Sequence, residues 1–123
     1  MEALLARAQD VRLAVFDVDG VLTDGRLYFT SEGQEIKAFS TLDGQGIKML
    51  INAGIQTAII TGRQSSMVEQ RARSLGIHHL VQGREDKLTV LDQLLAELGL
   101  NYTQVAYLGD DLPDLAAIRR VAL

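Results

Sequence analysis

The sequence predicts an α/β fold in which a central parallel sheet is covered by helices on both faces. Short apolar segments typical of buried strands alternate with segments whose apolar residues have helical spacing. Gly54, Gly76 and Gly99 each follow an expected helix and lie about 22 residues apart, the length of one helix–strand unit. The chain has 123 residues, and no linker divides them, so we expect a single domain over residues 1–123.

The N-terminal half should contain two helices, two strands of the sheet and a hairpin. Met1–Gln9 has a helical composition, and the apolar run Leu13–Phe16 predicts a buried strand. Residues 26–39 carry aromatic and β-branched residues on both sides of a Ser-Glu-Gly-Gln turn, which predicts a β-hairpin. Asp43 is a candidate N-cap for the next helix, and residues 55–60 predict the following strand.

The C-terminal half continues the alternation. Ser66 and Glu69 have the spacing of a capping box at the start of a helix, and residues 77–81 predict the strand after it. Leucines at helical spacing predict a helix over residues 85–98, and residues 104–108 predict a further strand. The only proline lies just inside a last helix, where the missing N–H is tolerated.

The composition excludes several classes of protein. Sixteen acidic residues outnumber 12 basic ones, whereas a protein that binds nucleic acid phosphates should carry a basic excess. The chain has no Cys and two adjacent His, which excludes disulfides, thiolate sites and a multi-His zinc centre. It has neither an apolar run of about 18 residues nor a signal-like N-terminus, so we expect a soluble, cytoplasmic protein that binds no membrane.

Acidic, hydroxyl and glycine residues follow three of the expected strands. These segments are residues 17–24, 61–63 and 109–114, and the first and last hold six of the ten Asp residues. The carboxyl ends of parallel strands meet at one edge of the sheet, where ligands bind. Clustered carboxylates repel one another unless a cation lies between them, and oxygen ligands of this kind suit Mg²⁺.

Lys87 supports an anion site at the same edge. It lies in the first turn of the helix over residues 85–98, where the helix dipole disfavours a cation unless that cation reaches an anion. Thr61, Gly62 and the loop amides after Asp17 can add neutral donors to a bound phosphate. This set suits phosphoryl transfer through an aspartyl-phosphate, with one Asp as nucleophile and a second as general acid/base.

The order of these residues resembles the haloacid dehalogenase superfamily of phosphatases. DVDGVLTD (17–24) matches its first motif, Thr61 its second, Lys87 its third and GDDLPD (109–114) its fourth. The resemblance extends from about Val11 to Leu123. It implies a Rossmann-like three-layer αβα fold with a central parallel sheet and a small β-hairpin in place of a cap domain.

The absent cap, the hairpin, TLDGQGIKML (41–50) and TGR (61–63) resemble the superfamily's capless sugar-acid phosphatases. These are Mg²⁺-dependent homotetramers, with hairpins at the subunit interface, that hydrolyse an eight-carbon sugar-acid 8-phosphate for lipopolysaccharide synthesis in Gram-negative bacteria. The resemblance implies the same small-molecule sugar phosphate substrate here.

The resemblance also implies a role for individual residues. Asp17 would be the nucleophile and Asp19 the general acid/base, while Thr61 and Lys87 would hold the phosphoryl group. The Asp17 carboxylate, the Asp19 main-chain oxygen and Asp110 would bind Mg²⁺. Substrate contacts, some from a neighbouring subunit, would come from Asp19, Ser40, Thr41, Leu42, Asp43, Gly44, Lys48, Arg63, Arg71 and Lys87.

The sequence departs from the resembling enzymes at two places. Many of them carry Arg where this chain has Leu42, whose apolar side chain offers no charged contact. They also continue past their fourth motif through another strand and a glycine-rich tail. We therefore expect that the chain lacks a C-terminal strand and tail.

Three alternative functions stay open at this point. A phosphatase for a nine-carbon, sialic-type acid 9-phosphate would have a similar site. A receiver-like signalling domain also clusters Asp, Thr and Lys, but its phosphorylated Asp ends the third strand, which here ends near Gln82–Gly83. A non-catalytic oligomerisation domain is the third. Asp24 fits a loop-capping role as well as a site role, and Lys48 and Arg71 also fit a solvated surface.

Overall fold

The computed structural model describes residues 1–123 and contains one sheet of four parallel strands in the order β5-β4-β1-β6. The strands are β1 (Leu13–Phe16), β4 (Gln56–Ile60), β5 (His79–Val81) and β6 (Val105–Leu108). Leu13 lies opposite Gln56 on one side and Val105 on the other, so β1 is central. The predicted α/β fold with a parallel sheet is confirmed.

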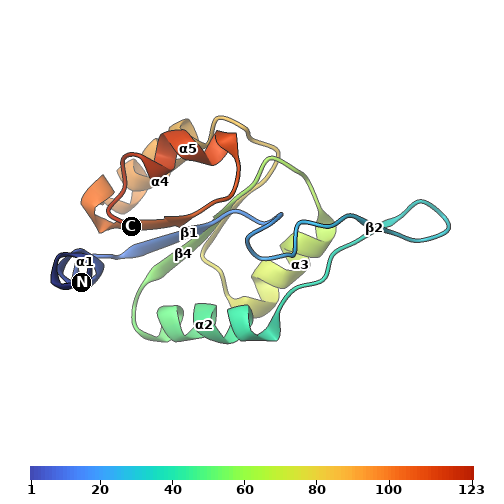
Figure 1. The fold of residues 1–123 in the computed structure, drawn as a ribbon, viewed down its shortest axis with the longest axis horizontal. Coiled ribbons are helices and arrows are strands. Elements are labelled where there is room, and N and C mark those ends of the chain that lie inside the picture. The colour runs from blue at the N-terminus through green and yellow to red at the C-terminus, as the bar shows by residue number, and fades with distance from the viewer.

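Helices cover both faces of this sheet (Figure 1). The helices are α1 (Glu2–Gln9), α2 (Thr41–Asn52), α3 (Ser66–Leu75), α4 (Lys87–Leu98), α5 (Leu112–Ile118) and the short 3₁₀ helix η1 (Tyr102–Gln104). α2 and α3 pack against one face, while α4 and α5 pack against the other. None of the helices is long and apolar enough to cross a lipid bilayer.

The buried strand β1 separates two hydrophobic cores because successive side chains of a strand point to opposite faces. Leu13 and Val15 pack with α4 and α5, whereas Ala14 and Phe16 pack with α2 and α3. All four residues are buried, so β1 is held on both faces and along both edges. The loop that follows Phe16 therefore starts from a fixed point.

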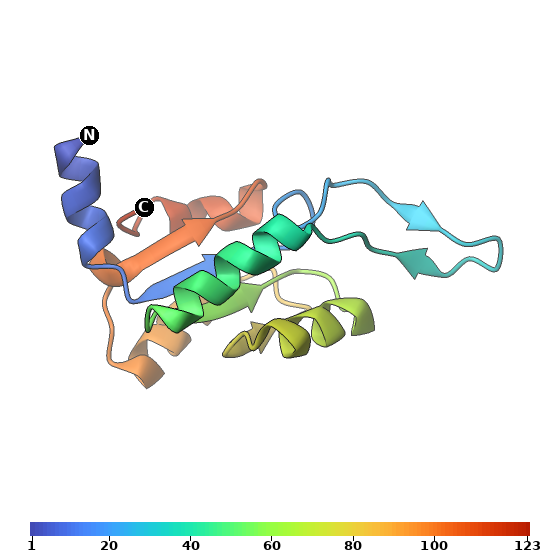
Figure 2. The same ribbon diagram turned by 90° about the horizontal axis from the view of Figure 1, so that it is seen from below.

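A two-stranded hairpin, β2 (Tyr28–Phe29) with β3 (Glu35–Ile36), follows β1. It extends away from the sheet at the end opposite α1, on the side of the strands' carboxyl ends (Figures 1 and 2). Gly33 has a φ of +83° in its turn, a conformation that glycine adopts without strain. The hairpin predicted over residues 26–39 is confirmed, although only its middle is paired.

Two of the predicted helix starts are wrong. α2 begins after Ser40, whose Oγ accepts from the Leu42 N–H, so Asp43 lies inside the helix rather than at its cap. α3 begins after Ser65 rather than Ser66, which excludes the predicted capping box with Glu69. An N-cap residue needs extended backbone, and Ser40 and Ser65 have it.

The strand order also excludes the receiver-like alternative. In receiver-type folds the first strand lies between the second and the third. Here β1 lies between β4 and β6, which are the second and fourth strands of the sheet along the chain. At the far edge of β6, the Tyr107 N–H donates to the Leu123 carbonyl, so the C-terminus lies beside that strand.

Candidate active site

The carboxyl ends of β1, β4 and β6 bring the predicted catalytic residues into one cavity of about 400 Å³. Asp17 follows β1, Thr61 follows β4 and Asp110 lies two residues beyond β6. The lining is almost wholly polar or glycine: Asp17, Asp19, Gly25, Leu27, Thr61, Gly62, Arg63, Glu85, Lys87, Asp110, Asp111 and Pro113. The predicted gathering of these groups at one sheet edge is confirmed.

Lys87 is the buried cation of this cavity. Its Nζ lies 2.7 Å from Oδ1 of Asp114 and 3.2 Å from Oδ1 of Asp17, and its side chain is 3% exposed. Burial lowers the pKa of Lys87, but the ion pairs with Asp114 and Asp17 outweigh burial, so its pKa is raised overall. Lys87 is therefore charged and sits beside the Asp17 carboxylate.

Asp114 holds Lys87 in place from the rear of the cavity. Its Oδ1 accepts hydrogen bonds from Lys87 and from the Tyr107 hydroxyl, and its Oδ2 accepts from the Asp111 N–H. Burial raises the pKa of Asp114, but these hydrogen bonds outweigh burial and lower it overall. Burial and the neighbouring Asp114 also raise the pKa of Tyr107. The Tyr107 hydroxyl therefore stays protonated and donates a hydrogen bond to Asp114.

Asp17 is the most perturbed carboxyl group of the cavity. Burial raises its pKa to about 6, against the hydrogen bond from the Val18 N–H (2.7 Å) and the attraction of Lys87. An Asp with this pKa is still ionised at neutral pH, and a carboxylate stripped of most of its water is a better nucleophile. A strongly shifted group in a cavity is a candidate for catalysis.

The acidic residues include a group that could hold a metal ion. Oxygens of Asp17, Asp110 and Asp114 lie within 4.8 Å of one another. Asp114 Oδ1 and Oδ2 both accept hydrogen bonds, whereas the Asp17 contacts with Val18 and Lys87 involve only its Oδ1, so Asp17 and Asp110 keep carboxylate oxygens for a metal ion. The metal-ligand set of Asp17, the Asp19 main-chain oxygen and Asp110 stays a prediction. Oxygen donors alone suit Mg²⁺, which takes one or two carboxylates, water and a phosphate oxygen.

The absence of a side chain at Gly20 leaves space for the Asp110 carboxylate. A Cβ on Gly20 would overlap the Asp110 carboxylate, and its φ of +84° is a left-handed conformation that disfavours other residues. Each of these two properties favours glycine at position 20. The overlap arises because the loop after β1 lies close to the loop after β6. The donor set, with glycine where a side chain would displace one carboxylate, fits a bound Mg²⁺.

Thr61 and Gly62 form the wall on the β4 side. Thr61 is buried, and a Cβ on Gly62 would overlap the Glu85 carboxylate. Glu85 lies just before α4, so glycine at position 62 lets the loops after β4 and β5 meet. Because the side chains of Thr61 and Gly62 are small, they leave space for a ligand beside Asp17.

Most of the predicted sugar contacts do not reach this cavity within one chain. Only Asp19, Arg63 and Lys87 of that set line it. The others lie on and around α2 and α3: Ser40, Thr41, Leu42, Asp43, Gly44, Lys48 and Arg71.

Contacts within the chain occupy several of these residues. Arg71 donates to the Ser40 carbonyl and lies over the Phe39 ring, and a Cβ on Gly44 would overlap its guanidinium. Leu42 is highly exposed at the edge of a separate apolar cavity of about 540 Å³ between α2 and the sheet. The role of this set as substrate contacts stays a prediction.

The structure assigns two other acidic residues to local structure. Asp24 accepts from the Arg26 N–H (2.9 Å) and from the Tyr28 hydroxyl (2.6 Å), which secures the base of the hairpin. These bonds lower the pKa of Asp24, and its side chain does not line the cavity. Asp111 caps α5 and forms a capping box with Asp114.

Sequence reasoning missed three charged residues, outside the recognised motifs, that contact or border the site: Glu35, Lys37 and Glu85. Lys37 donates to Asp19, Glu35 accepts from Arg63, and Glu85 lines the cavity. Glu35 and Lys37 belong to the hairpin segment, about 17 residues from Asp19, and no local pattern links them to it. Only the fold brings the base of the hairpin next to the strand ends.

Comparison with known proteins identifies the same family throughout. Residues 29–122 match the haloacid dehalogenase-like hydrolase family. The chain is 48% identical over 120 residues to the 3-deoxy-D-manno-octulosonate 8-phosphate phosphatase KdsC of Yersinia pestis and 45% identical to that of Escherichia coli K12. These alignments cover 98% of this chain and 64% of each relative, so the chain spans about two thirds of their length.

Solved structures agree with this assignment. A YrbI family protein from Pseudomonas syringae superposes with a TM-score of 0.97 at 70% identity, over 100% of this chain and 70% of that one. The KDO 8-phosphate phosphatase of Moraxella catarrhalis, solved with magnesium, phosphate and KDO, gives 0.96 at 48% identity, over 99% and 70% of the two chains. This chain belongs to the haloacid dehalogenase-like hydrolase family.

Proposed function

We propose that the protein is a Mg²⁺-dependent phosphatase that hydrolyses 3-deoxy-D-manno-octulosonate 8-phosphate through an aspartyl-phosphate on Asp17. The observation that carries this proposal is the juxtaposition of Asp17 with Lys87 and Asp110 at the strand ends. The relatives named for this reaction and the M. catarrhalis complex support the substrate and the metal.

The residues of this chain can perform the reaction in two steps. An Asp17 oxygen attacks phosphorus, the bond between phosphorus and the sugar's oxygen breaks, and Asp19 gives that oxygen a proton. Asp19 then takes a proton from a water molecule, which attacks phosphorus and releases phosphate from Asp17. Lys87 and Thr61 stabilise the negative oxygens of the transferring group throughout.

Asp17, Asp110 and the main-chain oxygen of Asp19 would hold the Mg²⁺ ion. A bound Mg²⁺ supplies positive charge against the phosphoryl oxygens and offsets the repulsion between the two carboxylates. The acid excess at these strand ends is then largely neutralised in the working site.

The sugar acid would meet cations around the cavity. Arg63 lies at the rim, half exposed, where it can pair with a carboxylate of the substrate. Ser40–Gly44, Lys48 and Arg71 lie outside the cavity of their own chain, so we assign them to contacts made across a subunit boundary. A nine-carbon acid 9-phosphate is the competing substrate.

We also propose a homotetramer with the hairpins at the interface. Leu27, Phe29 and Ile36 are 57%, 60% and 48% exposed on a hairpin that extends into solvent. An exposed apolar group of this kind is typical of an interaction surface. We propose a cytoplasmic location, as for an enzyme that acts on a small soluble sugar phosphate.

Phosphate release from purified protein tests the activity. We expect turnover of the eight-carbon substrate with Mg²⁺, none with EDTA, and a loss of at least about 10³-fold in Asp17→Asn. A higher kcat/KM for the nine-carbon 9-phosphate would reassign the substrate. Absence of Mg²⁺-dependent turnover, with assembly intact by sedimentation, would support a non-catalytic oligomerisation domain instead.

A further inference from the structure

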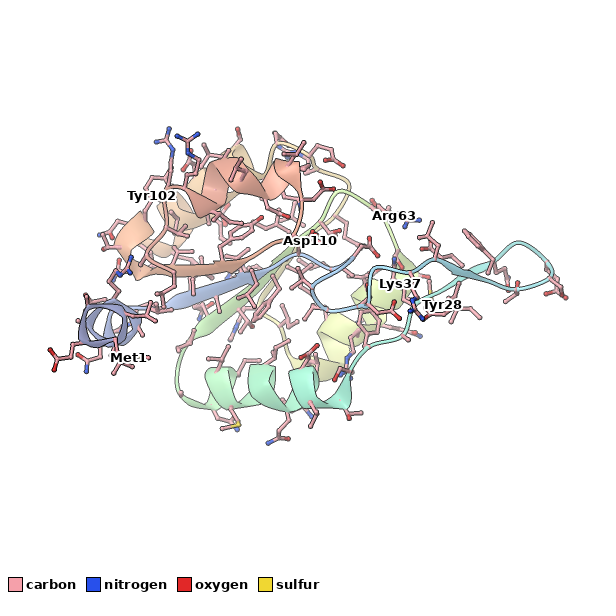
Figure 3. All side chains as sticks on the ribbon, viewed as in Figure 1. Met1, Tyr28, Lys37, Arg63, Tyr102 and Asp110 are labelled. Carbon is pink, nitrogen blue, oxygen red and sulfur yellow. The ribbon has the colours of Figure 1, made fainter.

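Lys37 is a buried cation on an otherwise exposed hairpin. Its side chain is 4% exposed, whereas Phe29 and Ile36 on the paired strands are exposed. It lies directly after β3, where the hairpin returns to the body of the molecule (Figure 3). A buried ammonium group is costly unless it is paired, so its partners define what it does.

Those partners are two carboxylates. The Lys37 Nζ lies 2.7 Å from Oδ1 of Asp19 and 3.3 Å from Oε1 of Glu35. The other oxygen of Glu35 lies 2.7 Å from Nη2 of Arg63. The four side chains form a chain of alternating charge in the order Asp19, Lys37, Glu35, Arg63.

The two ends of this chain line the Asp17 cavity, and the two middle members do not. Asp19 and Arg63 are in the lining, whereas Lys37 and Glu35 lie behind it on the hairpin side. Lys37 lines instead a pocket between the hairpin and α3, with Phe39, Met67 and Gln70. The hairpin therefore holds two cavity residues from outside.

The orientation of the Asp19 side chain depends on such a contact. It lies in a loop, and its side chain is 30% exposed, so packing alone does not fix its rotamer. A general acid must point at the oxygen that leaves, and a displacement of about 1 Å costs a large factor in rate.

We propose that Lys37 is a positioning residue that fixes the Asp19 carboxylate for proton transfer to the leaving sugar oxygen. This proposal rests on the proposed phosphatase function. Lys37 touches neither phosphorus nor the leaving oxygen and acts only through Asp19. The effect of Lys37 should depend on the leaving group. A sugar alkoxide needs a proton from Asp19 in order to leave, whereas the 4-nitrophenolate released from 4-nitrophenyl phosphate does not.

Two substrates and one variant test this. We expect Lys37→Met to lower kcat/KM for the sugar phosphate by about 10- to 100-fold and that for 4-nitrophenyl phosphate by less than about 3-fold. kcat/KM reports phosphoryl transfer to Asp17 without the later hydrolysis. Asp19→Asn should give the same selectivity with a larger loss, and Lys37→Arg should restore part of the sugar phosphate activity.

Arg73→Met is the matched control. Arg73 is an exposed cation on α3 that pairs only with Glu69, so both activities should stay within about 2-fold of wild type. Wild-type turnover of both substrates, measured in parallel, reports on the proposed function itself.

Equal losses on both substrates, or no loss on either, would overturn the positioning role. Should Lys37→Met fail to fold, Lys37→Gln keeps a neutral hydrogen-bond donor at this position and leaves Glu35 and Arg63 unchanged. We expect Lys37→Gln to show a smaller loss with the same preference for the activated substrate. Loss without that preference would also contradict the proposal.

Discussion

Lys87 donates a 2.7 Å hydrogen bond to Asp114, and both side chains are buried between the end of the sheet and α5. The pair joins the first residue of α4 to the first turn of α5, directly behind Asp17. An ion pair in this position fixes the cation that faces the proposed nucleophile. It also makes the stability of the fold depend on a residue that we propose to be catalytic.

Replacement of Lys87 should therefore destabilise the protein as well as inactivate it. Lys87→Met leaves Asp17 and Asp114 buried without their cation, and we expect the free energy of unfolding to fall by about 3–5 kcal/mol. Urea denaturation without divalent cations measures this. In the double variant with Asp114→Asn, part of the loss should be recovered, and strictly additive losses would contradict the coupling.

The Tyr107 hydroxyl should contribute a smaller amount. Tyr107→Phe removes a buried 2.9 Å hydrogen bond to Asp114, and we expect a loss of about 1–2 kcal/mol in the free energy of unfolding. The ring keeps its packing, so the change isolates the hydroxyl. Tyr102→Phe is the control, because the Tyr102 hydroxyl bonds Asp92 at the surface. Its loss should be smaller, and equal losses would show that the Asp114 contact adds nothing.

Gly20 should control metal binding. Gly20→Ala places a methyl group on the Asp110 carboxylate, so we expect Mg²⁺ affinity by titration calorimetry to fall about 10-fold or more. Gly33→Ala is the matched control, because Gly33 has a φ of +83° and no atom near its Cβ position. Both variants should lose about 1–2 kcal/mol to backbone strain, and only Gly20→Ala should bind Mg²⁺ more weakly.

The pKa of Asp17 predicts how stability changes with pH in the absence of metal. Burial raises this pKa to about 6, from 3.8 for an ordinary Asp, so between these values the folded protein binds the proton more tightly than the unfolded chain. The stability that the protonated group contributes is lost as pH rises through 6. The Asn side chain of the Asp17→Asn variant does not ionise, so the variant lacks this pH-dependent contribution.

We expect the free energy of unfolding of Asp17→Asn, relative to wild type, to rise by about 2–3 kcal/mol between pH 4 and pH 7. Chemical denaturation in EDTA at several pH values measures it. A difference that is constant or falls with pH would show that Asp17 is not destabilised by burial.

The sequence predicted the parallel sheet and the strand-end residues because both depend on local patterns. Apolar runs such as Leu13–Phe16 mark strands buried on both faces, and the residues after them must lie at one sheet edge. Helix starts were less predictable. Ser40 and Ser65 cap α2 and α3 because their backbone is extended, and nearby Asp43 and Ser66 offer equally good side chains.

The sequence by itself determined the fold class and the residues that gather in the cavity at the strand ends: Asp17, Asp19, Thr61, Lys87 and Asp110. Only the tertiary structure decided that Lys37 lies against Asp19, and that Ser40–Gly44 lie away from the cavity. The physical reason is the separation along the chain between the residues that interact. Strand and helix patterns repeat every two to four residues, whereas the ion pair of Lys37 with Asp19 depends on where a whole hairpin packs.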